Sequence, residues 1–187
     1  MKKVAGFALL LALFNGSSLA ADYVIDGSGA GMHSSVQFKA IHVGVSALWG
    51  RFNDITGSFS YDADDISAST IEVMIDPASI DSNHAARDEH LASADFLNVA
   101  SFPEAKFVST SIMDKGEGMA TVTGDFTLHG VTNEISFDIV RTGEGETPFG
   151  DYRVGFEGSL AIDLADYGIS PISPQIELLL AIEGIRQ

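Results

Sequence analysis

The segment of the sequence best suited to chemistry is Arg87-Asp88-Glu89-His90, four charged or titratable residues in a row. On a helix, Arg87 and His90 are three residues apart and therefore share a face. Together they can hydrogen-bond a ligand head group or a quinone oxygen. The alternative is structural: Arg87 pairs with a nearby carboxylate and His90 caps a neighbouring turn.

Other residues with catalytic or metal-binding chemistry are poorly spaced for it. The five histidines, His33, His42, His84, His90 and His129, include no His-Glu-x-x-His and no local pair typical of zinc chelation. The chain has no cysteine and no Gly-x-Ser-x-Gly, so it offers no thiol nucleophile and no acyl-transfer motif. With 26 acidic residues, no carboxylate pair stands out as an acid–base couple. We therefore predict a protein that is not an enzyme and that carries no metal or other cofactor.

Apolar residues recur with a period of two along most of the chain, which predicts β-strands. These strands must form the scaffold that positions Arg87 and His90. The polar residues between the apolar ones would cost several kcal/mol each if they were buried unpaired. One face of each strand is therefore expected to point inward: Val36/Phe38/Ala40, Ile71/Val73/Ile75, Val122/Phe126/Leu128, Ile135/Phe137/Ile139, Val154/Phe156/Leu160/Ile162 and Ile176/Leu178/Leu180/Ile182.

Turn residues separate these strands at hairpin distances, which indicates consecutive antiparallel neighbours. About eight strands without crossover helices fit a closed barrel or a two-sheet sandwich. Several strands are long, over residues 104–114, 118–129 and 150–163, and closure removes exposed edges. The sequence therefore predicts an all-β protein, an eight-stranded antiparallel up-and-down barrel.

Two segments depart from the strand pattern. Residues 83–92 follow capping residues and contain helix formers without a period-two apolar face, which predicts one short inserted helix over a barrel mouth. Residues 45–50, which include the only tryptophan, Trp49, are expected to be a second short helical or irregular piece.

The N-terminus is typical of a secretory signal peptide, with Lys2 and Lys3 before an apolar run that ends near Phe14. Small residues at Ser18 and Ala20 predict cleavage after Ala20, leaving one domain over residues 21–187. The apolar run is shorter than the roughly 20 residues that a membrane-spanning helix needs, so we expect no stable membrane insertion. The net charge of −16 disfavours nucleic acid and anionic membrane surfaces as partners.

The interior of an eight-stranded barrel is either filled by side chains or wide enough for one ligand. Flat aromatic rings on or next to the inward faces favour a lumen that buries a flexible apolar chain. The residues expected to line the lumen and its mouth are Phe38, Trp49, Phe52, Ile75, Arg87, His90, Phe96, Phe126, Phe137, Phe156, Leu178 and Leu180.

The order of short motifs resembles the YceI-like family of lipocalin-like, polyisoprenoid-binding bacterial envelope proteins. The resemblance covers nearly the whole mature chain and rests on these segments: Tyr23-Val24-Ile25-Asp26, His33-Ser34-Ser35-Val36-Gln37-Phe38, Gly50-Arg51-Phe52, Arg87-Asp88-Glu89-His90-Leu91, Phe102-Pro103-Glu104-Ala105-Lys106-Phe107 and Gly124-Asp125-Phe126-Thr127-Leu128-His129-Gly130. The sequence departs from the family in a longer connection over residues 27–32. It also has Leu164-Ala165 where relatives often carry basic residues.

The resemblance implies a lipocalin-type barrel in the periplasm that holds a polyisoprenoid or an isoprenoid quinone. Our first hypothesis is a periplasmic carrier for an isoprenoid or fatty-acyl lipid, with this hydrophobic small molecule as its partner and a homodimer as an open alternative. The second is a quinone-linked enzyme or redox-accessory protein in which His33, Arg87 and His90 converge. The third is a stress-related structural barrel with a filled core.

Overall fold

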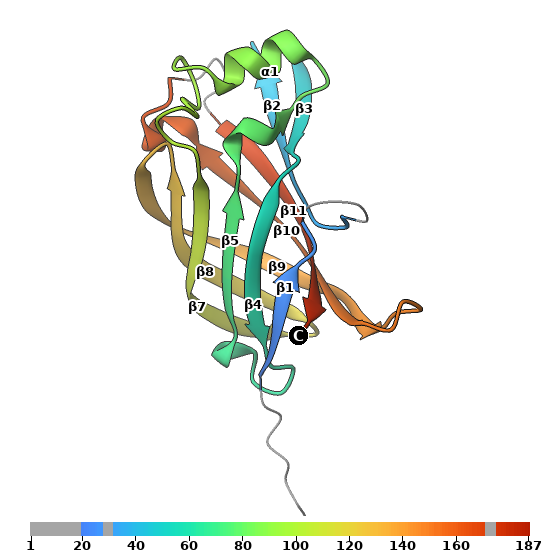
Figure 1. The fold of residues 1–187 in the computed structure, drawn as a ribbon. Coiled ribbons are helices and arrows are strands. Elements are labelled where there is room, and N and C mark those ends of the chain that lie inside the picture. The colour runs from blue at the N-terminus through green and yellow to red at the C-terminus, as the bar shows by residue number, and fades with distance from the viewer. Residues whose placement is uncertain (1–19, 28–31, 171–174) are drawn as a thin grey trace, which may run out of the picture.

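The computed structural model of the protein describes residues 20–27, 32–170 and 175–187 (Figure 1). The predicted signal peptide lies outside the described residues, apart from Ala20. The first strand begins at Ala21.

The described residues form eleven strand segments, one α-helix and three short 3-10 helices. The strands are β1 (Ala21–Ile25), β2 (Ser35–His42), β3 (Ser46–Phe52), β4 (Ile55–Tyr61), β5 (Thr70–Ile75), β6 (Ile80–Asp81), β7 (Ala105–Gly116), β8 (Met119–Leu128), β9 (Val131–Glu146), β10 (Tyr152–Asp163) and β11 (Gln175–Arg186). The helices are η1 (Ile66–Ala68), η2 (Pro77–Ser79), α1 (Ala85–Ala92) and η3 (Leu164–Tyr167).

The eleven segments build eight long strands, because three of the eight are interrupted. β2 pairs with β3 and β1 pairs with β4, so β1 with β2 forms one long strand and β3 with β4 the next. β4 pairs with β5 and β3 with β6, which makes β5 with β6 the third. β7 to β11 are continuous and pair in chain order.

The last strand returns to the first and closes the barrel (Figure 1). β11 pairs with β1 through Val24↔Ile185 and with β2 through Phe38↔Leu178, both antiparallel. The protein is therefore all-β, with an eight-stranded antiparallel up-and-down barrel, as the alternation predicts. Closure pairs the backbone N–H and C=O groups that the edge strands of an open sheet would leave unpaired.

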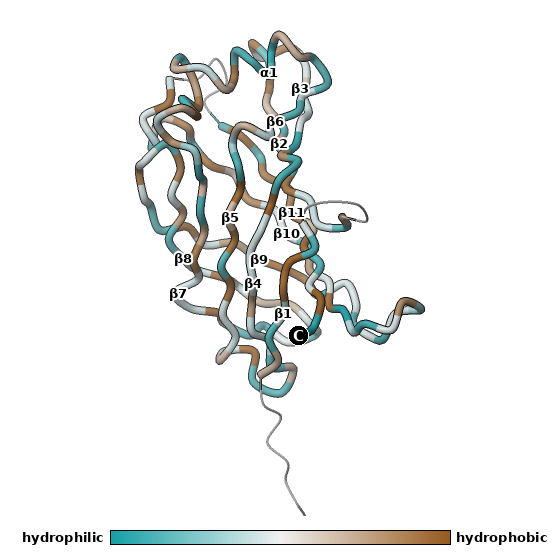
Figure 2. Tube along the Cα trace, in the orientation of Figure 1, coloured by the Kyte–Doolittle hydropathy of each residue, from teal (hydrophilic) through white to brown (hydrophobic). Residues whose placement is uncertain are grey.

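Hydrophobic and hydrophilic residues alternate along the strands, which gives the barrel wall an apolar inner face (Figure 2). The residues expected to face inward do so. Val36, Phe126 and Val154 are at most 7% exposed, and Phe137 and Leu180 line the interior. The register is fixed because a slip by one residue would bring the polar set of every strand inside.

The predicted helix is confirmed as α1, which lies across one end of the barrel (Figure 1). His84 caps its N-terminus, because the Nδ1 atom of His84 accepts a hydrogen bond from the backbone N–H of Arg87 at 3.2 Å. Among the described residues, no helix has the length and hydrophobicity needed to cross a bilayer.

The expectation of a helical or irregular piece over residues 45–50 is wrong. This segment is most of β3, which pairs with β2 through Phe38↔Gly50 and Lys39↔Trp49. The alternation is hidden here because both faces carry apolar side chains: Leu48 points into the barrel, whereas Val45 and Trp49 are exposed.

Several aromatic rings of the inner face lie directly over glycines of neighbouring strands. At Gly124 on β8, a methyl group would lie 2.7 Å from Cζ of Phe107 and would also collide with the carbonyl oxygen of Val108. The strand therefore tolerates only glycine here, since the Phe107 ring occupies the space of a side chain.

We predict that Gly124→Ala lowers the free energy of unfolding by about 2–3 kcal/mol, because backbone atoms must shift to admit the methyl group. Urea denaturation measures this value. The matched control is Gly143→Ala on β9, where a methyl group meets no atom within 4 Å. Equal losses in the two variants would contradict the packing argument.

Candidate functional site

Two cavities lie inside the barrel and meet in its middle. One, of about 290 Å³, is the helix-side cavity next to α1, and the other, of about 130 Å³, is the far cavity, which extends toward the opposite end. Four residues line both cavities: Val36, Ile75, Phe126 and Leu178. We call these four residues the waist. Because the waist belongs to both linings, the two cavities adjoin there, and the barrel interior contains two neighbouring apolar spaces.

The helix-side cavity is built by inward side chains of the first strands and covered by the segment around α1. Phe38 and Phe52 come from β2 and β3, and their ring centroids are 5.9 Å apart. Phe96 and Leu97 follow α1 and complete the cover. His42, Arg87 and His90 are the lining side chains with strong hydrogen-bonding groups.

Arg87 and His90 lie together on the helix-side cavity, as their spacing predicts, and both also have structural partners. The guanidinium of Arg87 donates to Oγ of Ser82 at 2.7 Å and to the carbonyl oxygen of Ser82 at 2.5 Å. His90 lies 3.6 Å from a carboxylate oxygen of Asp95, and its ring contacts Phe96 edge to face. The two side chains form a partly satisfied polar rim on an apolar cavity.

Asp88 on the same helix fixes the turn that leads into α1. Its carboxylate accepts a hydrogen bond from the backbone N–H of Ser82 at 2.8 Å and a second one from the hydroxyl of Ser82. Although partial burial opposes it, these hydrogen bonds hold the pKa of Asp88 below its usual range. The carboxylate is therefore ionised at neutral pH and serves to anchor the helix.

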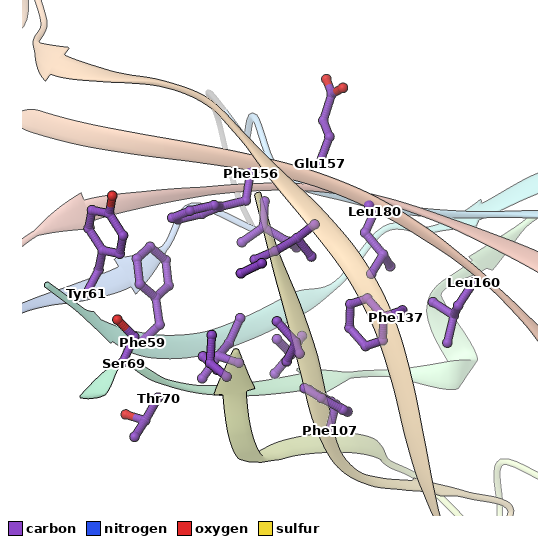
Figure 3. A pocket seen from close by; sticks show the side chains of 18 of the residues that line it. Phe59, Tyr61, Ser69, Thr70, Phe107, Phe137, Phe156, Glu157, Leu160 and Leu180 are labelled. Carbon is purple, nitrogen blue, oxygen red and sulfur yellow. The ribbon is translucent and has the colours of Figure 1, made fainter. Parts of the chain in front are cut away.

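The far cavity is lined by aromatic and branched side chains of both barrel walls. Figure 3 shows Phe59, Tyr61 and Phe156 at one end of the group and Phe137, Leu160 and Leu180 at the other. The Phe156 ring meets Tyr61 and Phe59 edge to face, at centroid distances of 5.4 and 5.8 Å. Flat apolar surfaces of this kind suit a flexible hydrocarbon chain.

The polar end of the far cavity consists of Arg141 and Tyr61. The guanidinium of Arg141 donates to the Tyr61 hydroxyl at 3.2 Å and to Glu144 at 2.6 Å. Burial raises the pKa of Tyr61 despite the nearby Arg141, so the hydroxyl is neutral at physiological pH. Sequence reasoning overlooks Arg141, although it continues the inward-facing series of Ile135, Phe137 and Ile139.

Eleven of the twelve residues predicted to line the lumen and mouth line one or both cavities: Phe38, Phe52, Ile75, Arg87, His90, Phe96, Phe126, Phe137, Phe156, Leu178 and Leu180. Contact of these residues with a ligand stays a prediction. Trp49 is the exception, and its placement on the inner face is wrong. It points outward, is 51% exposed, and has the ammonium of Lys39 5.6 Å from its ring.

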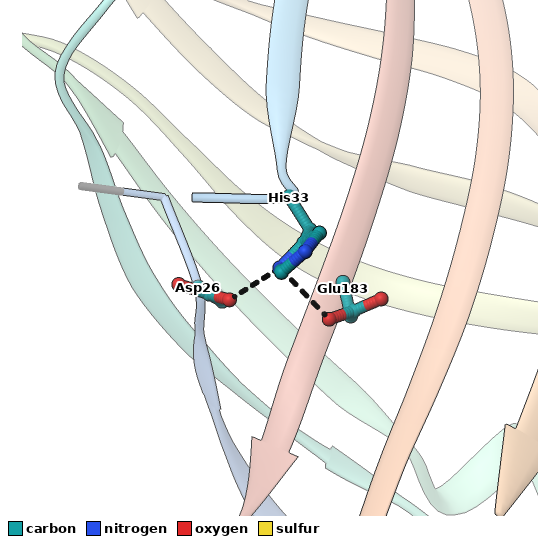
Figure 4. A group of neighbouring side chains, drawn as sticks. All are labelled: Asp26, His33 and Glu183. Carbon is teal, nitrogen blue, oxygen red and sulfur yellow. Dashed lines mark hydrogen bonds and ion pairs between the residues drawn. The ribbon is translucent and has the colours of Figure 1, made fainter. Parts of the chain in front are cut away.

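A second group of titratable residues lies outside the cavities. His33, Asp26 and Glu183 converge near the start of β2 (Figure 4). The guanidinium of Arg153 joins them, donating to Asp26 at 2.8 Å and to Glu183 at 2.5 Å, and also binds Asp151 at 2.8 Å. A cation therefore already occupies the centre of the group, which makes it an ion-pair network rather than a metal site.

The quinone-linked hypothesis requires His33 to meet Arg87 and His90, and the structure separates them. His33 Nδ1 lies 3.0 Å from Asp26 and 3.5 Å from Glu183, within the Arg153 network. Arg87 and His90 line the helix-side cavity instead. The three residues do not form one constellation.

Comparison with known proteins places these features in context. Residues 23–184 match the YceI-like domain. A UPF0312 protein of Shewanella sp. (strain ANA-3) is 49% identical over 189 residues, covering 96% of this chain and 98% of that protein. The crystal structure of Burkholderia cenocepacia BcnA is similar with a TM-score of 0.73 at 18% identity, covering 80% of this chain and 95% of that one. A polyisoprenoid binding domain from Saccharophagus degradans is similar with a TM-score of 0.67 at 15% identity, covering 90% and 100%. Both solved structures share the barrel fold.

Proposed function

Because the chain belongs to the YceI-like domain family, we propose that it is a binding protein that holds one long-chain amphiphile inside its barrel. The ligand class is a polyisoprenoid, an isoprenoid quinone or a fatty-acyl lipid. The observation that carries this proposal is the pair of apolar cavities that adjoin at the waist inside the barrel. A barrel with a purely structural role has no need of such a space.

The shape of the interior favours a chain over a compact ligand. β10 and β11 have 12 residues each, and a strand of that length extends about 40 Å. Burying a hydrocarbon chain contributes about 0.8 kcal/mol for each CH₂ removed from water. The Saccharophagus degradans domain is described as polyisoprenoid binding, which makes an isoprenoid the first candidate.

The polar rim sets the orientation of the ligand in this proposal. His42, Arg87 and His90 line the helix-side cavity, where hydrogen-bond donors can meet a hydroxyl, phosphate or quinone oxygen. In the lining of the far cavity, as far as the structure describes it, Arg141 is the one basic side chain, against three basic or imidazole side chains in the helix-side cavity. The head group therefore lies next to α1, and the hydrocarbon tail passes the waist into the far cavity.

Binding rather than catalysis is the proposed activity, and export to the periplasm is part of the proposal. Residues 1–20 direct that export, and the barrel then carries or sequesters a lipid that has no stable place in water. Arg87 and His90 of the polar rim can hydrogen-bond a ligand. His33, which the quinone-linked alternative also needs, is instead held in the Arg153 network.

Titration with isoprenoid alcohols of increasing length tests the proposal. Geraniol, farnesol, geranylgeraniol and solanesol, followed by native mass spectrometry, should bind one per barrel, with affinity that rises with chain length. Absence of binding by the folded protein, or affinity independent of chain length, would contradict it. If Arg87→Ala and His90→Ala leave binding unchanged but abolish a turnover of the ligand, the quinone-linked enzyme is the better account.

A further inference from the structure

The hairpin of β2 and β3 differs in composition from the rest of the chain. Residues 27–53 contain no aspartate or glutamate, although the protein has 26 acidic residues in 187. The same stretch contains Lys39 and Arg51. In a protein of net charge −16, this hairpin therefore contributes no acidic side chain of its own, and Glu177 of the neighbouring strand β11 is paired with Lys39.

The outer face of this hairpin is apolar at its tip. Val43 is 59% exposed, Val45 is 82% exposed and Trp49 is 51% exposed. We call Val43, Val45 and Trp49 the hairpin tip. An outward-facing strand surface of a water-exposed barrel is normally polar, as it is at Thr121, Thr123, Asp125 and Thr127 of β8.

The turn between β2 and β3 also carries an apolar residue where a polar one is usual. The N–H of Val45 donates to the carbonyl oxygen of His42 at 2.9 Å, which defines a two-residue turn over Val43 and Gly44. Both residues have positive φ, 45° and 76°, a conformation that asparagine, aspartate and glycine favour. A β-branched residue such as Val43 is unfavourable at the first position of this turn. Val43 therefore places an apolar side chain where the backbone conformation favours asparagine, aspartate or glycine.

The inner face of the same hairpin lines the helix-side cavity through Phe38, Ala40, His42 and Leu48. The hairpin of β2 and β3 lies beside α1 (Figure 1). Its inner face thus lines the cavity, whereas the hairpin tip is exposed. A lipid leaving this cavity past the hairpin would meet whatever surface the tip touches.

We propose that the hairpin tip docks the barrel on a lipid bilayer surface, with the α1 end of the barrel next to the membrane. The valines enter the boundary between head groups and acyl chains. Trp49, with the Lys39 ammonium over its ring, lies at head-group level, where amphipathic aromatic rings are enriched. Lys39 is also paired with Glu177 at 2.9 Å, so apolar contact rather than net charge supplies most of the attraction. This inference rests on the proposed lipid-binding function.

Vesicles of phosphatidylcholine test the docking, and Trp49 reports it because it is the only tryptophan. The mature protein should co-sediment with the vesicles, and its fluorescence should shift to the blue. Val43→Asp with Val45→Asp should lower the vesicle affinity at least tenfold. The matched control is Met113→Asp, since Met113 on β7 is 61% exposed and pairs with Thr121 on β8, outside the hairpin. A Val43→Ser with Val45→Ser variant covers the case in which the aspartates impair folding.

The binding of geranylgeraniol without vesicles separates this inference from the proposed function. The hairpin variants should bind it as the unaltered protein does. If the unaltered protein binds geranylgeraniol but no vesicles, or if the aspartates leave vesicle binding unchanged, the docking inference is overturned and the proposed function stands. If the aspartates instead convert a dimer to a monomer without affecting vesicles, the tip is a contact between copies and the inference is also overturned. Vesicle binding that depends on the tip, without any geranylgeraniol binding, supports docking and contradicts the proposed function.

Discussion

Ile75→Trp is expected to lower the affinity for geranylgeraniol at least tenfold while the barrel stays folded. Ile75 belongs to the waist, where the helix-side and far cavities meet, and it packs against both buried clusters of the interior. An indole at this position adds bulk at the boundary where the two cavities adjoin, which a tail that occupies both cavities must cross. A ligand tail could then occupy only one of them and would lose the burial that the other supplies.

The matched control for this variant is Met74→Trp on the same strand. Met74 faces outward, where it pairs with Thr56 on β4 and Lys106 on β7. The Met74→Trp variant introduces the same indole side chain outside the cavities. Its affinity for geranylgeraniol should therefore stay within a factor of about two of that of the unaltered protein. Native mass spectrometry measures occupancy, and circular dichroism checks the fold. Full occupancy of Ile75→Trp by the longest isoprenoid would show that the tail does not pass the waist.

Arg153→Met is expected to lower the free energy of unfolding by about 2 kcal/mol, between the small contribution of exposed ion pairs and the larger loss when a buried pair is broken. The guanidinium joins Asp26 after β1, Asp151 before β10 and Glu183 on β11. These elements form the seam that closes the barrel, so removing the cation leaves three carboxylates facing one another there. Urea denaturation measures the loss.

The decrease in the free energy of unfolding caused by Arg153→Met should also depend on pH. Hydrogen bonds from Arg153, with a further one from Thr147, hold the pKa of Asp151 below its usual value. The unfolded chain therefore takes up this proton at a higher pH than the folded chain does, so the stabilisation is present above about pH 4 and is lost as the pH falls toward the folded pKa. The difference in stability between the unaltered protein and Arg153→Met should narrow from pH 5 to pH 3.

The control for the seam is Lys115→Met, which breaks the more exposed ion pair with Asp138. Lys115→Met should lower the free energy of unfolding clearly less than Arg153→Met does. If the two variants are equally stable, or if the difference between the unaltered protein and Arg153→Met does not change with pH, the Arg153 network does not hold the seam.

The barrel and most of its lining are predictable from the sequence because one-sided burial leaves a period-two pattern. Phe137 and Leu180 can be placed inside from their alternation with polar neighbours. Arg141 could be found in the same way, as a cation at an inward position. Trp49 could not, because apolar side chains on both faces of β3 erase the pattern at that point.

The Arg153 network was beyond sequence reasoning for a different reason. Arg153 is 127 residues from Asp26 along the chain, and only barrel closure brings these two together, whereas Glu183 lies on β11, which is paired with the strand of Arg153. The sequence predicts that a barrel forms, but it does not predict which surface residues meet across the closing seam. His33 belongs to this network for the same reason, which separates it from Arg87 and His90.

The central claim is that the interior holds a long-chain lipid, and organic extraction of the purified protein followed by mass spectrometry tests it most directly. The protein should be expressed with its export signal in a bacterium that makes polyisoprenoids, and Ile75→Trp should be purified in parallel. We predict close to one long-chain isoprenoid or fatty-acyl lipid per barrel from the unaltered protein and much less from Ile75→Trp. A consistently empty extract from the folded, unaltered protein, with no uptake of added isoprenoid, would contradict the account.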